Sequence, residues 1–409
     1  MPPRLTAGHA VRRLRRRRAG MLAVAALALA SVAASRLPLE SQEAPTPPAG
    51  QGRAAPGAAA APDAPGAAGP LPGMPPPPDP DDVYAADRPG QLSPTVRGFR
   101  ARVYVPTASG TVEVIDPRSF RRVARFAVGR LPQHVTPSWD LRTLWVGNNQ
   151  SNSLTAVDPA SGRPVRTVPV DDPYNLYFTP DGRRAIVVAE ALRRLDFRDP
   201  RSMRLRHALP VPCEGVDHMD FSADGRQLLA SCEFSGELVQ VDVARERVVR
   251  VVRLDAGAMP QDVKLAPDGS VFYVADLAAG GVWVVDAARF RVAGFVPTGK
   301  GAHGLYASRD SRVLYVSNRG AGSVSLISFA TRKVVATWHL PGGGSPDMGG
   351  VSADGRVLWL SGRYAAEVYA IATRNGRLLA RIPVGRGPHG LCVYPQPGRY
   401  SLGHTGVFR

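Results

Sequence analysis

A repeat of just over forty residues occupies the chain after residue 100 and limits the folds open to it. Its marker is a turn aspartate, and successive markers lie 41, 43, 44, 42 and 44 residues apart. The markers are Asp140, Asp181, Asp224, Asp268, Asp310 and Asp354. Four of them are followed by glycine, and Asp-Gly between two alternating apolar runs is typical of a tight β-hairpin turn.

Each repeat contains four short apolar runs and no helical pattern. In the clearest repeat these runs span 262–266, 271–275, 281–285 and 291–296. Four strands every 40 to 45 residues are the pattern of a β-propeller blade. The complete units span 130–170, 171–211, 212–255, 256–299, 300–342 and 343–385.

The two ends of the repeat region complement each other. Residues 101–129 hold three strands but lack the first one, and residues 388–394 are a first strand alone. Joining the C-terminal strand to the N-terminal strands would leave no open sheet edge. The sequence therefore predicts an all-β fold, a seven-bladed β-propeller of four-stranded blades with its ring closed in this way.

The remaining segments differ from the repeat in composition. Residues 1–35 combine an Arg-rich start with 14 apolar or small residues at 21–34, which indicates a signal peptide or signal anchor. Residues 36–99 are rich in Pro, Ala and Gly and are expected to form a disordered tether. We expect the propeller to span 100–395, with 396–409 as a C-terminal tail. The protein is then exported, extracellular or associated with the cell envelope, and meets the membrane only through its N-terminal segment.

Short motifs within the repeats carry a family resemblance. The second strands read LYVSN at 314–318, FYVAD at 272–276 and LWVGN at 144–148, and two first strands begin with AHG at 302–304 and PHG at 388–390. These motifs resemble the YVTN repeat of the YncE-like seven-bladed β-propellers. The resemblance implies a mostly exported bacterial family, similar to the haem-binding propeller of cytochrome nitrite reductases and to lactonase propellers. It implies the fold and not an activity, because the repeat residues build the blades.

Histidines recur at the start of the first strand, which in a propeller lies at the mouth of the central channel. They occupy alternate blades at intervals of 84, 85 and 86 residues, as His134, His218, His303 and His389. The blades between them place Asn175, Asp262 and Asp347 there, and Asp217 precedes His218. Imidazole and carboxylate are ligands of Zn, Cu or Fe, so the four histidines are candidate metal ligands. The alternative is a structural lining that satisfies backbone groups at the crowded axis.

Loops between the second and third strands open on the same face. They add further candidate ligand-binding residues at the channel mouth, namely Asn148, Asn318, Arg319, Arg363 and Tyr364. Amides, arginines and an aromatic ring suit a carbohydrate, a peptide or an anionic ligand. A solvated set of loops has the same composition, and that alternative stays open.

The chain has three cysteines. Cys213 precedes the first strand of its blade and Cys232 ends the second, so an antiparallel hairpin brings them to the same end. A disulfide between Cys213 and Cys232 is possible in an oxidising compartment. Cys392 is expected to be a buried thiol.

Charge and motifs narrow the functional classes. The net charge of +17 is scattered, and no basic run of five occurs after residue 100, so nucleic-acid binding is not expected. GxGxxG matches at 299–304 and 385–390 precede strands rather than helices and are not nucleotide sites. The sequence favours a monomeric, non-catalytic binding or scaffold protein without a cofactor, which takes a small molecule, glycan or protein at the channel mouth. The alternative is a lactonase-like or metal-dependent enzyme that uses the His/Asp ring.

Overall fold

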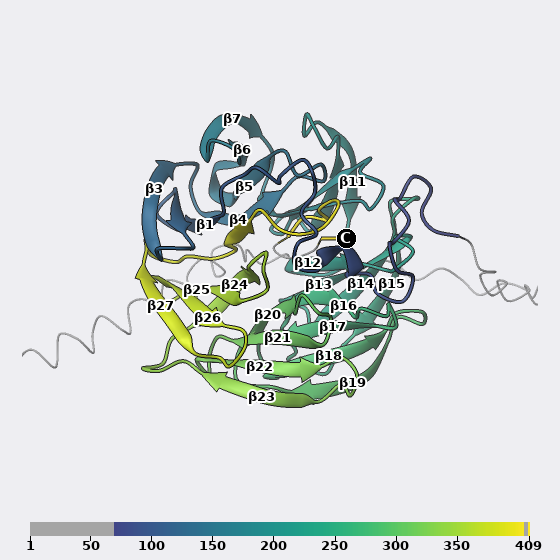
Figure 1. The fold of residues 1–409 in the computed structure, drawn as a ribbon. Helices are drawn as coiled ribbons and strands as arrows, with labels where there is room; N and C mark the ends of the chain where they lie inside the picture. The colour runs from purple at the N-terminus through teal and green to yellow at the C-terminus, as the bar shows by residue number, and fades with distance from the viewer. Residues whose placement is uncertain (1–68, 405–407) are drawn as a thin grey trace, which may run out of the picture. The chain divides into compact units, whose positions relative to one another are not determined.

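The computed structural model describes residues 69–404 and 408–409, and these form a ring of seven antiparallel four-stranded sheets (Figure 1). The chain is a seven-bladed β-propeller, as the repeat predicts. The expected signal segment, 1–35, and the first part of the expected tether, 36–68, lie outside the described residues. None of the helices in the described part of the chain has the length and hydropathy needed to cross a membrane.

Strands within a blade follow one another outward from the channel. The first blade consists of β28 (Cys392–Tyr394), β1 (Arg102–Thr107), β2 (Thr111–Asp116) and β3 (Arg121–Ala127). The second and third consist of β4 (Pro132–Pro137), β5 (Leu144–Asn148), β6 (Ser153–Asp158), β7 (Arg163–Pro169), β8 (Pro173–Phe178), β9 (Ala185–Ala189), β10 (Arg194–Arg198) and β11 (Leu205–Pro210). The fourth and fifth consist of β12 (Val216–Phe221), β13 (Gln227–Cys232), β14 (Glu237–Asp242), β15 (Arg247–Arg253), β16 (Pro260–Leu265), β17 (Val271–Asp276), β18 (Gly281–Asp286) and β19 (Arg291–Pro297). The last two consist of β20 (Ala302–Ala307), β21 (Val313–Asn318), β22 (Ser323–Ser328), β23 (Val334–His339), β24 (Pro346–Val351), β25 (Val357–Gly362), β26 (Glu367–Ala372) and β27 (Leu378–Pro383). Two short 3-10 turns, η1 (Ala85–Asp87) and η2 (Asn149–Ser151), accompany these strands in the described residues.

The ring closes through its two ends. Strand β28 pairs antiparallel with β1, opposing Tyr394 to Arg102 and Cys392 to Tyr104. The C-terminal strand is thus the innermost strand of the first blade, as the sequence predicts. Closure gives the N-terminal sheet the inner strand that its own segment lacks.

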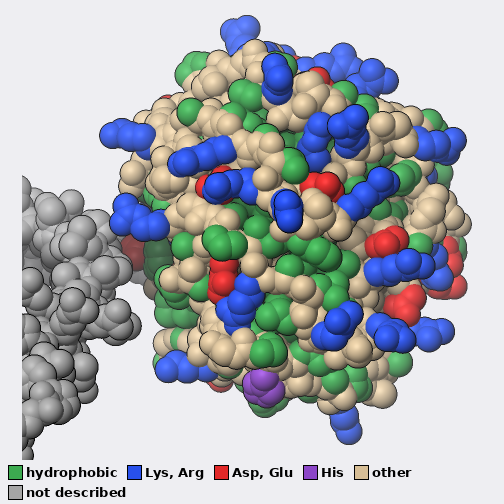
Figure 2. All heavy atoms as spheres, turned by 60° about the vertical axis from the view of Figure 1, so that its left-hand side comes forward, with side chains coloured by type: hydrophobic (Ala, Val, Ile, Leu, Met, Phe, Trp, Pro, Cys, Tyr) green, Lys and Arg blue, Asp and Glu red, His purple; other side chains and the backbone are tan. Residues whose placement is uncertain are grey.

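Apolar side chains pack between neighbouring blades. The described residues contain seven buried hydrophobic clusters, and each joins two adjacent sheets. The outermost strands are mostly exposed, as the burial of β3 and β7 shows. Figure 2 shows Lys and Arg side chains scattered over one face, with few Asp or Glu between them. On that face the basic residues do not gather into a continuous stripe.

The segment from residue 69 to 99 packs on the propeller, so the tether predicted for 36–99 is wrong for this part. Leu71, Val83, Tyr84 and Val96 are buried. The backbone nitrogen of Val83 donates to the Pro267 carbonyl at 2.8 Å, and the Tyr84 hydroxyl donates to the Leu265 carbonyl at 2.8 Å. Scattered large apolar residues anchor a Pro-rich segment that its average composition assigns to disorder.

A buried ion pair also anchors this segment. Asp87 lies against Arg309, and both side chains are about 95% buried. Arg309 also donates to the Val351 carbonyl at 2.8 Å and to the Gln396 side chain, so it connects the N-terminal segment, the last blade and the C-terminal segment. Burial raises the pKa of Asp87 to about 7, although Arg309 opposes this shift.

Residues 396–409 were predicted to be a tail, but the described residues 396–404 and 408–409 pack on the propeller, and we call them the C-terminal strap. Tyr400, Leu402 and Arg409 are buried in it. The Arg409 guanidinium donates to Asp220 at 3.2 Å and to the Phe221 carbonyl at 2.9 Å, at the end of β12. Figure 1 shows the C-terminus beside β12, on the face of the ring. A tail in solution would leave these apolar groups exposed to water. The apolar residues of the segment therefore indicate packing, although its place after the last blade suggested a tail.

A disulfide joins Cys213 and Cys232, whose Cα atoms lie 6.1 Å apart. It ties the segment before β12 to the end of β13 in the fourth blade. Cys392 is a buried free thiol, and burial raises its pKa.

Replacing Asp87 tests the packing of the N-terminal segment. We expect Asp87→Ala to lower the free energy of unfolding by about 3 kcal/mol at pH 8, because Arg309 keeps a buried charge without its partner. The exposed Asp81→Ala is the matched control and should unfold like the wild type. Urea denaturation followed by circular dichroism measures both. Equal stabilities of the two variants would mean that the segment does not hold Asp87 against Arg309.

Candidate functional site

Irregular pairing at the start of the inner strands directs polar side chains into the channel. In the second to seventh blades the register between the first and second strands shifts at this point, as between Pro132 and Val135 on either side of His134. A shift of this kind redirects a side chain that regular alternation would turn toward the neighbouring sheet. Seven of the residues predicted from the repeat lie there, and His389 lies just before β28 of the first blade. All eight are at least 98% buried, namely His134, Asn175, Asp217, His218, Asp262, His303, Asp347 and His389.

Five imidazole rings meet in the channel. The ring centroid of His134 lies 5.4 Å from that of His218 and 4.8 Å from that of His389. His303 lies 5.8 Å from His389 and 6.2 Å from His218. The fifth ring, His404, lies 4.6 Å from His218 and 5.0 Å from His134.

His404 comes from the C-terminal strap and was not predicted. Its backbone nitrogen donates to the Leu176 carbonyl at 3.2 Å, which fixes the strap against β8. Gly403 before it has φ +107°, and a Cβ there would lie 2.4 Å from the Leu176 oxygen, so only glycine fits. His404 lies outside the repeat, and the periodic pattern therefore carries no signal for it. The nearby apolar residues Tyr400 and Leu402 are the one sequence indication that this segment is buried.

Three of the five histidines form a possible metal site. One ring nitrogen each from His134, His218 and His404 lie within 4.8 Å of one another. Nitrogens that bind one ion at about 2.1 Å lie up to roughly 4 Å apart, so small side-chain movements would suffice. The site therefore shares two members with the predicted set, and His404 joins them in place of His303 and His389.

His134 lacks a hydrogen-bond partner. Both of its ring nitrogens are buried, and neither is hydrogen-bonded among the described residues. A Cβ at position 390 would lie 2.0 Å from its Nδ1, so Gly390 leaves the space that the ring occupies. Buried polar groups nearly always have a partner, and a buried imidazole without one indicates a ligand position.

Carboxylates orient the surrounding rings. The Nδ1 atoms of His389 and His303 lie 2.9 and 3.1 Å from the two oxygens of Asp347. The Nε2 of His404 lies 3.5 Å from Asp262. Contacts from imidazole to carboxylate of this type fix ring orientation around bound metals. His218 differs, because its Nε2 is 3.1 Å from Asp217 without hydrogen-bond geometry, and its Nδ1 lies 3.0 Å from the amide nitrogen of Asn175.

Burial keeps these imidazoles neutral. Desolvation lowers the pKa of His134, His303 and His389 well below the usual value, and the positive charge of Arg363 adds to the effect on His134 and His389. It lowers the pKa of His218 to about 3, and it also lowers the pKa of His404. Neutral imidazole is the form that binds a metal ion.

The acidic groups of the channel divide into two kinds. Burial raises the pKa of Asp217 well above its usual value, and Glu233 and Glu190 add to this effect. Burial also acts on Asp262, but His404 and Lys264 outweigh it and lower the pKa of that carboxyl. The surroundings thus favour the protonated form of Asp217 and the ionised form of Asp262.

The predicted loop residues lie in two different places. Asn148 and Asn318 are buried, and their amides donate to hydroxyls of their own blades, Thr155 at 2.9 Å and Ser325 at 2.9 Å. They stabilise the loops and do not line the channel mouth. Arg319 does reach the channel, since it lies 3.2 Å from Asp347.

The rim of the channel mouth contains the other predicted residues. The Arg319 guanidinium lies 5.5 Å from the ring centroid of Tyr364, which is 76% exposed. Arg363 is partly buried, and its charge contributes to the lowered pKa of His389. Tyr174, which was not predicted, has its ring 5.6 Å from that of His134 and its hydroxyl 3.5 Å from His389 Nε2. It precedes Asn175 in β8, and both side chains lie beside channel histidines.

The sequence profile of the YNCE-like β-propellers matches residues 96–397. The chain belongs to this family. The YncE-like propeller is 24% identical over 276 residues to the uncharacterized protein YncE of Salmonella typhi, an alignment that covers 62% of this chain and 74% of the relative. The resemblance in the repeat motifs is thereby confirmed.

Solved structures share the fold of this YncE-like propeller. The dihydro-haem d1 dehydrogenase NirN, solved with DHE, is 17% identical with a TM-score of 0.57, covering 74% of this chain and 76% of NirN. A candidate 6-phosphogluconolactonase from Bacteroides uniformis is 16% identical with a TM-score of 0.57, covering 71% of this chain and 98% of its own. At these identities the likeness is one of fold.

The lowered pKa values predict the charge state of the channel. We expect His134, His218, His303 and His389 of the YncE-like propeller to be neutral at pH 6 in metal-free protein, because burial opposes their protonation. Long-range nitrogen–proton correlation spectra of protein labelled at histidine report the charge of each ring. The exposed ring of His339 provides an internal comparison. Charged-imidazole signals from the channel at pH 6 would contradict the burial of the cluster.

Proposed function

We propose that this chain is an exported propeller that binds one transition-metal ion in its channel through His134, His218 and His404. The observation that carries the proposal is the buried ring of His134, which lies beside the two other rings and has no hydrogen-bond partner for either nitrogen in the part of the chain that the structure describes. A structural lining would be expected to satisfy these nitrogens. A ligand in the channel supplies the missing partner.

The donor set defines the class of metal. Three neutral imidazoles suit zinc, copper, nickel or iron(II) and do not suit magnesium or calcium, which prefer oxygen ligands. Three protein ligands leave a further position open, and a bound ion of this class supplies a Lewis-acid or redox centre there. Burial raises the pKa of Asp217 and of the Tyr174 hydroxyl near these rings, and Asp262 contacts His404 and orients it.

Export is part of the proposal. It is supported by the apolar stretch at 21–34 after an Arg-rich start and by the disulfide between Cys213 and Cys232. Disulfides persist in oxidising compartments and are rare in the cytosol. Of the functions that the sequence leaves open, the proposal keeps ligand binding at the channel and names a metal ion as the ligand.

Metal binding by the purified full chain tests the proposal. After chelator treatment, the protein is titrated with Zn²⁺, Cu²⁺, Ni²⁺ or Co²⁺ alone, and bound metal is measured calorimetrically and by elemental analysis. We expect one ion per chain, and we expect His134→Ala and His404→Ala to lose it. His339→Ala, on the exposed outer strand β23, is the matched control and should bind like the wild type.

Two further changes complement the alanine variants. Asp262→Asn should weaken binding roughly 10- to 100-fold by releasing His404 without removing a ligand. A chain that ends at residue 395 keeps the closing strand β28 but loses the C-terminal strap, and it should lose the ion as well. Circular dichroism verifies the fold of each variant. Absence of binding by the wild type, or unchanged binding by folded His134→Ala, would refute the proposal.

A further inference from the structure

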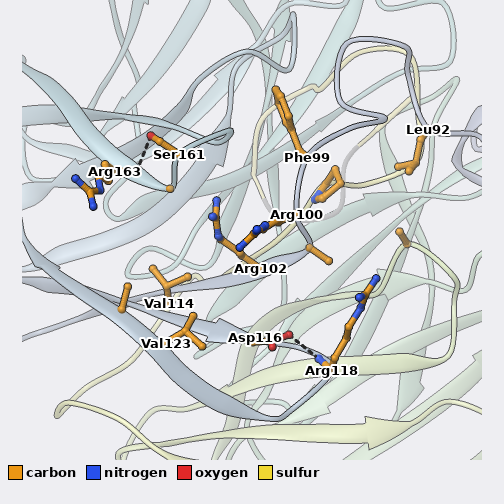
Figure 3. A pocket seen from close by; sticks show the side chains of 15 residues that line it. Leu92, Phe99, Arg100, Arg102, Val114, Asp116, Arg118, Val123, Ser161 and Arg163 are labelled. Carbon is orange, nitrogen blue, oxygen red and sulfur yellow. Dashed lines mark hydrogen bonds between the residues drawn. The ribbon is translucent and has the colours of Figure 1, made fainter.

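A second possible ligand site lies away from the channel, on the outer part of the first blade. It is a cavity of about 830 Å³, within the range of small-molecule sites. Its walls come from the N-terminal segment at Leu92 and Phe99, from β2 and β3, and from the turn of the second blade at Ser161 (Figure 3). No residue of the histidine cluster lines it.

Positive charge exceeds negative charge among the residues that line this cavity. Arg100, Arg102, Arg118 and Arg163 line it, and the one carboxylate among the lining residues is Asp116. Asp116 is already engaged, since it accepts from the backbone nitrogen of Arg118 at 2.9 Å and from the Ser119 hydroxyl at 3.1 Å. Among residues 69–404 and 408–409, none of the four arginines forms an ion pair, whereas many arginines elsewhere on the propeller do.

The guanidinium groups that line the cavity differ in their contacts. Arg102 is held in place, because it donates to the Pro159 and Ala160 carbonyls at 3.1 and 3.3 Å. Arg100 and Arg118 are exposed, and no acceptor for either side chain occurs in the described part of the chain. Guanidinium groups in this state are free to bind a carboxylate, phosphate or sulfonate with paired hydrogen bonds.

Apolar surface borders the charged groups. In the view of Figure 3, Arg100 and Arg102 lie between Phe99 on one side and Val114 and Val123 on the other. Val123 is 56% exposed, and Pro395 completes the apolar lining. A small inorganic anion would use the arginines and leave this surface in contact with water.

We propose that this cavity binds a soluble amphipathic anion, a carboxylate, phosphate or sulfonate that carries an acyl chain or an aromatic ring. The charge of the lining matches the anionic group, and Phe99, Val114 and Val123 match the apolar body. The occupant is a dissolved molecule rather than a bilayer, because the apolar surface lies in a cavity lined by the N-terminal segment, the first blade, turns of the second and seventh blades, and Pro395. The proposal is independent of the metal in the channel.

Titration of the full chain with 8-anilino-1-naphthalenesulfonate, an aryl sulfonate that fluoresces in apolar surroundings, tests the site. We expect saturable binding of one molecule per chain. Arg100→Gln/Arg118→Gln should weaken it about tenfold or more, because two charged donors are lost. Arg97→Gln/Arg142→Gln removes the same charge from exposed positions outside the cavity and should leave binding unchanged. Val123→Asp, at an exposed position, should weaken binding without disturbing the fold.

Competition identifies the chemistry of the ligand. Decyl phosphate below its micelle concentration should displace the probe, and inorganic phosphate at the same concentration should not. Equal probe binding by Arg100→Gln/Arg118→Gln and by the wild type would overturn the proposal, and so would displacement by inorganic phosphate. Arginine-dependent co-sedimentation with phosphatidylglycerol vesicles, without displacement by decyl phosphate, would overturn the assignment to a dissolved molecule.

Discussion

The backbone pairing of β28 with β1 is the constraint on which the rest of the structure depends. Seven similar sheets have no channel until their inner strands surround one axis, and these two strands, from opposite ends of the chain, complete the circle. His389 lies just before β28, and Gly390 leaves room for the His134 ring. The same closure that removes a sheet edge therefore also brings the histidines of distant blades together.

The channel reverses the usual composition of a protein interior. Between the blades the buried residues are apolar, but at the axis five imidazoles, three carboxyl groups and Asn175 are buried together. Burying polar groups is unfavourable unless they are paired. Asp347 and Asp262 provide part of this pairing, whereas the ring of His134 has none. Buried polar groups at the axis thus lack some of the hydrogen-bond partners that they need, and a ligand bound there could supply them.

Periodic features were predictable from the sequence, and the features that break the period were not. The Asp-Gly spacing predicted the blades and their closure, and the strand starts predicted His134, His218 and their partners in the channel. Asn148 and Asn318 were predicted at the channel mouth, but their side chains point into their own blades. Their orientation depends on hydrogen bonds to neighbouring hydroxyl groups. His404 and the packed segment at 69–99 make contacts with residues distant in sequence, and no local pattern encodes such contacts.

The cluster of His134, His218 and His404 can form only after the C-terminal strap has been synthesised. The chain is synthesised from its N-terminus, so His134 and His218 emerge long before β28 and His404. An unfinished chain has neither a closed ring nor the third imidazole, and it cannot retain an ion with this set of ligands. The complete set of three imidazoles is therefore available only in the finished chain, and a metal ion bound there would come from the surroundings in which that finished chain folds rather than from those in which its synthesis begins.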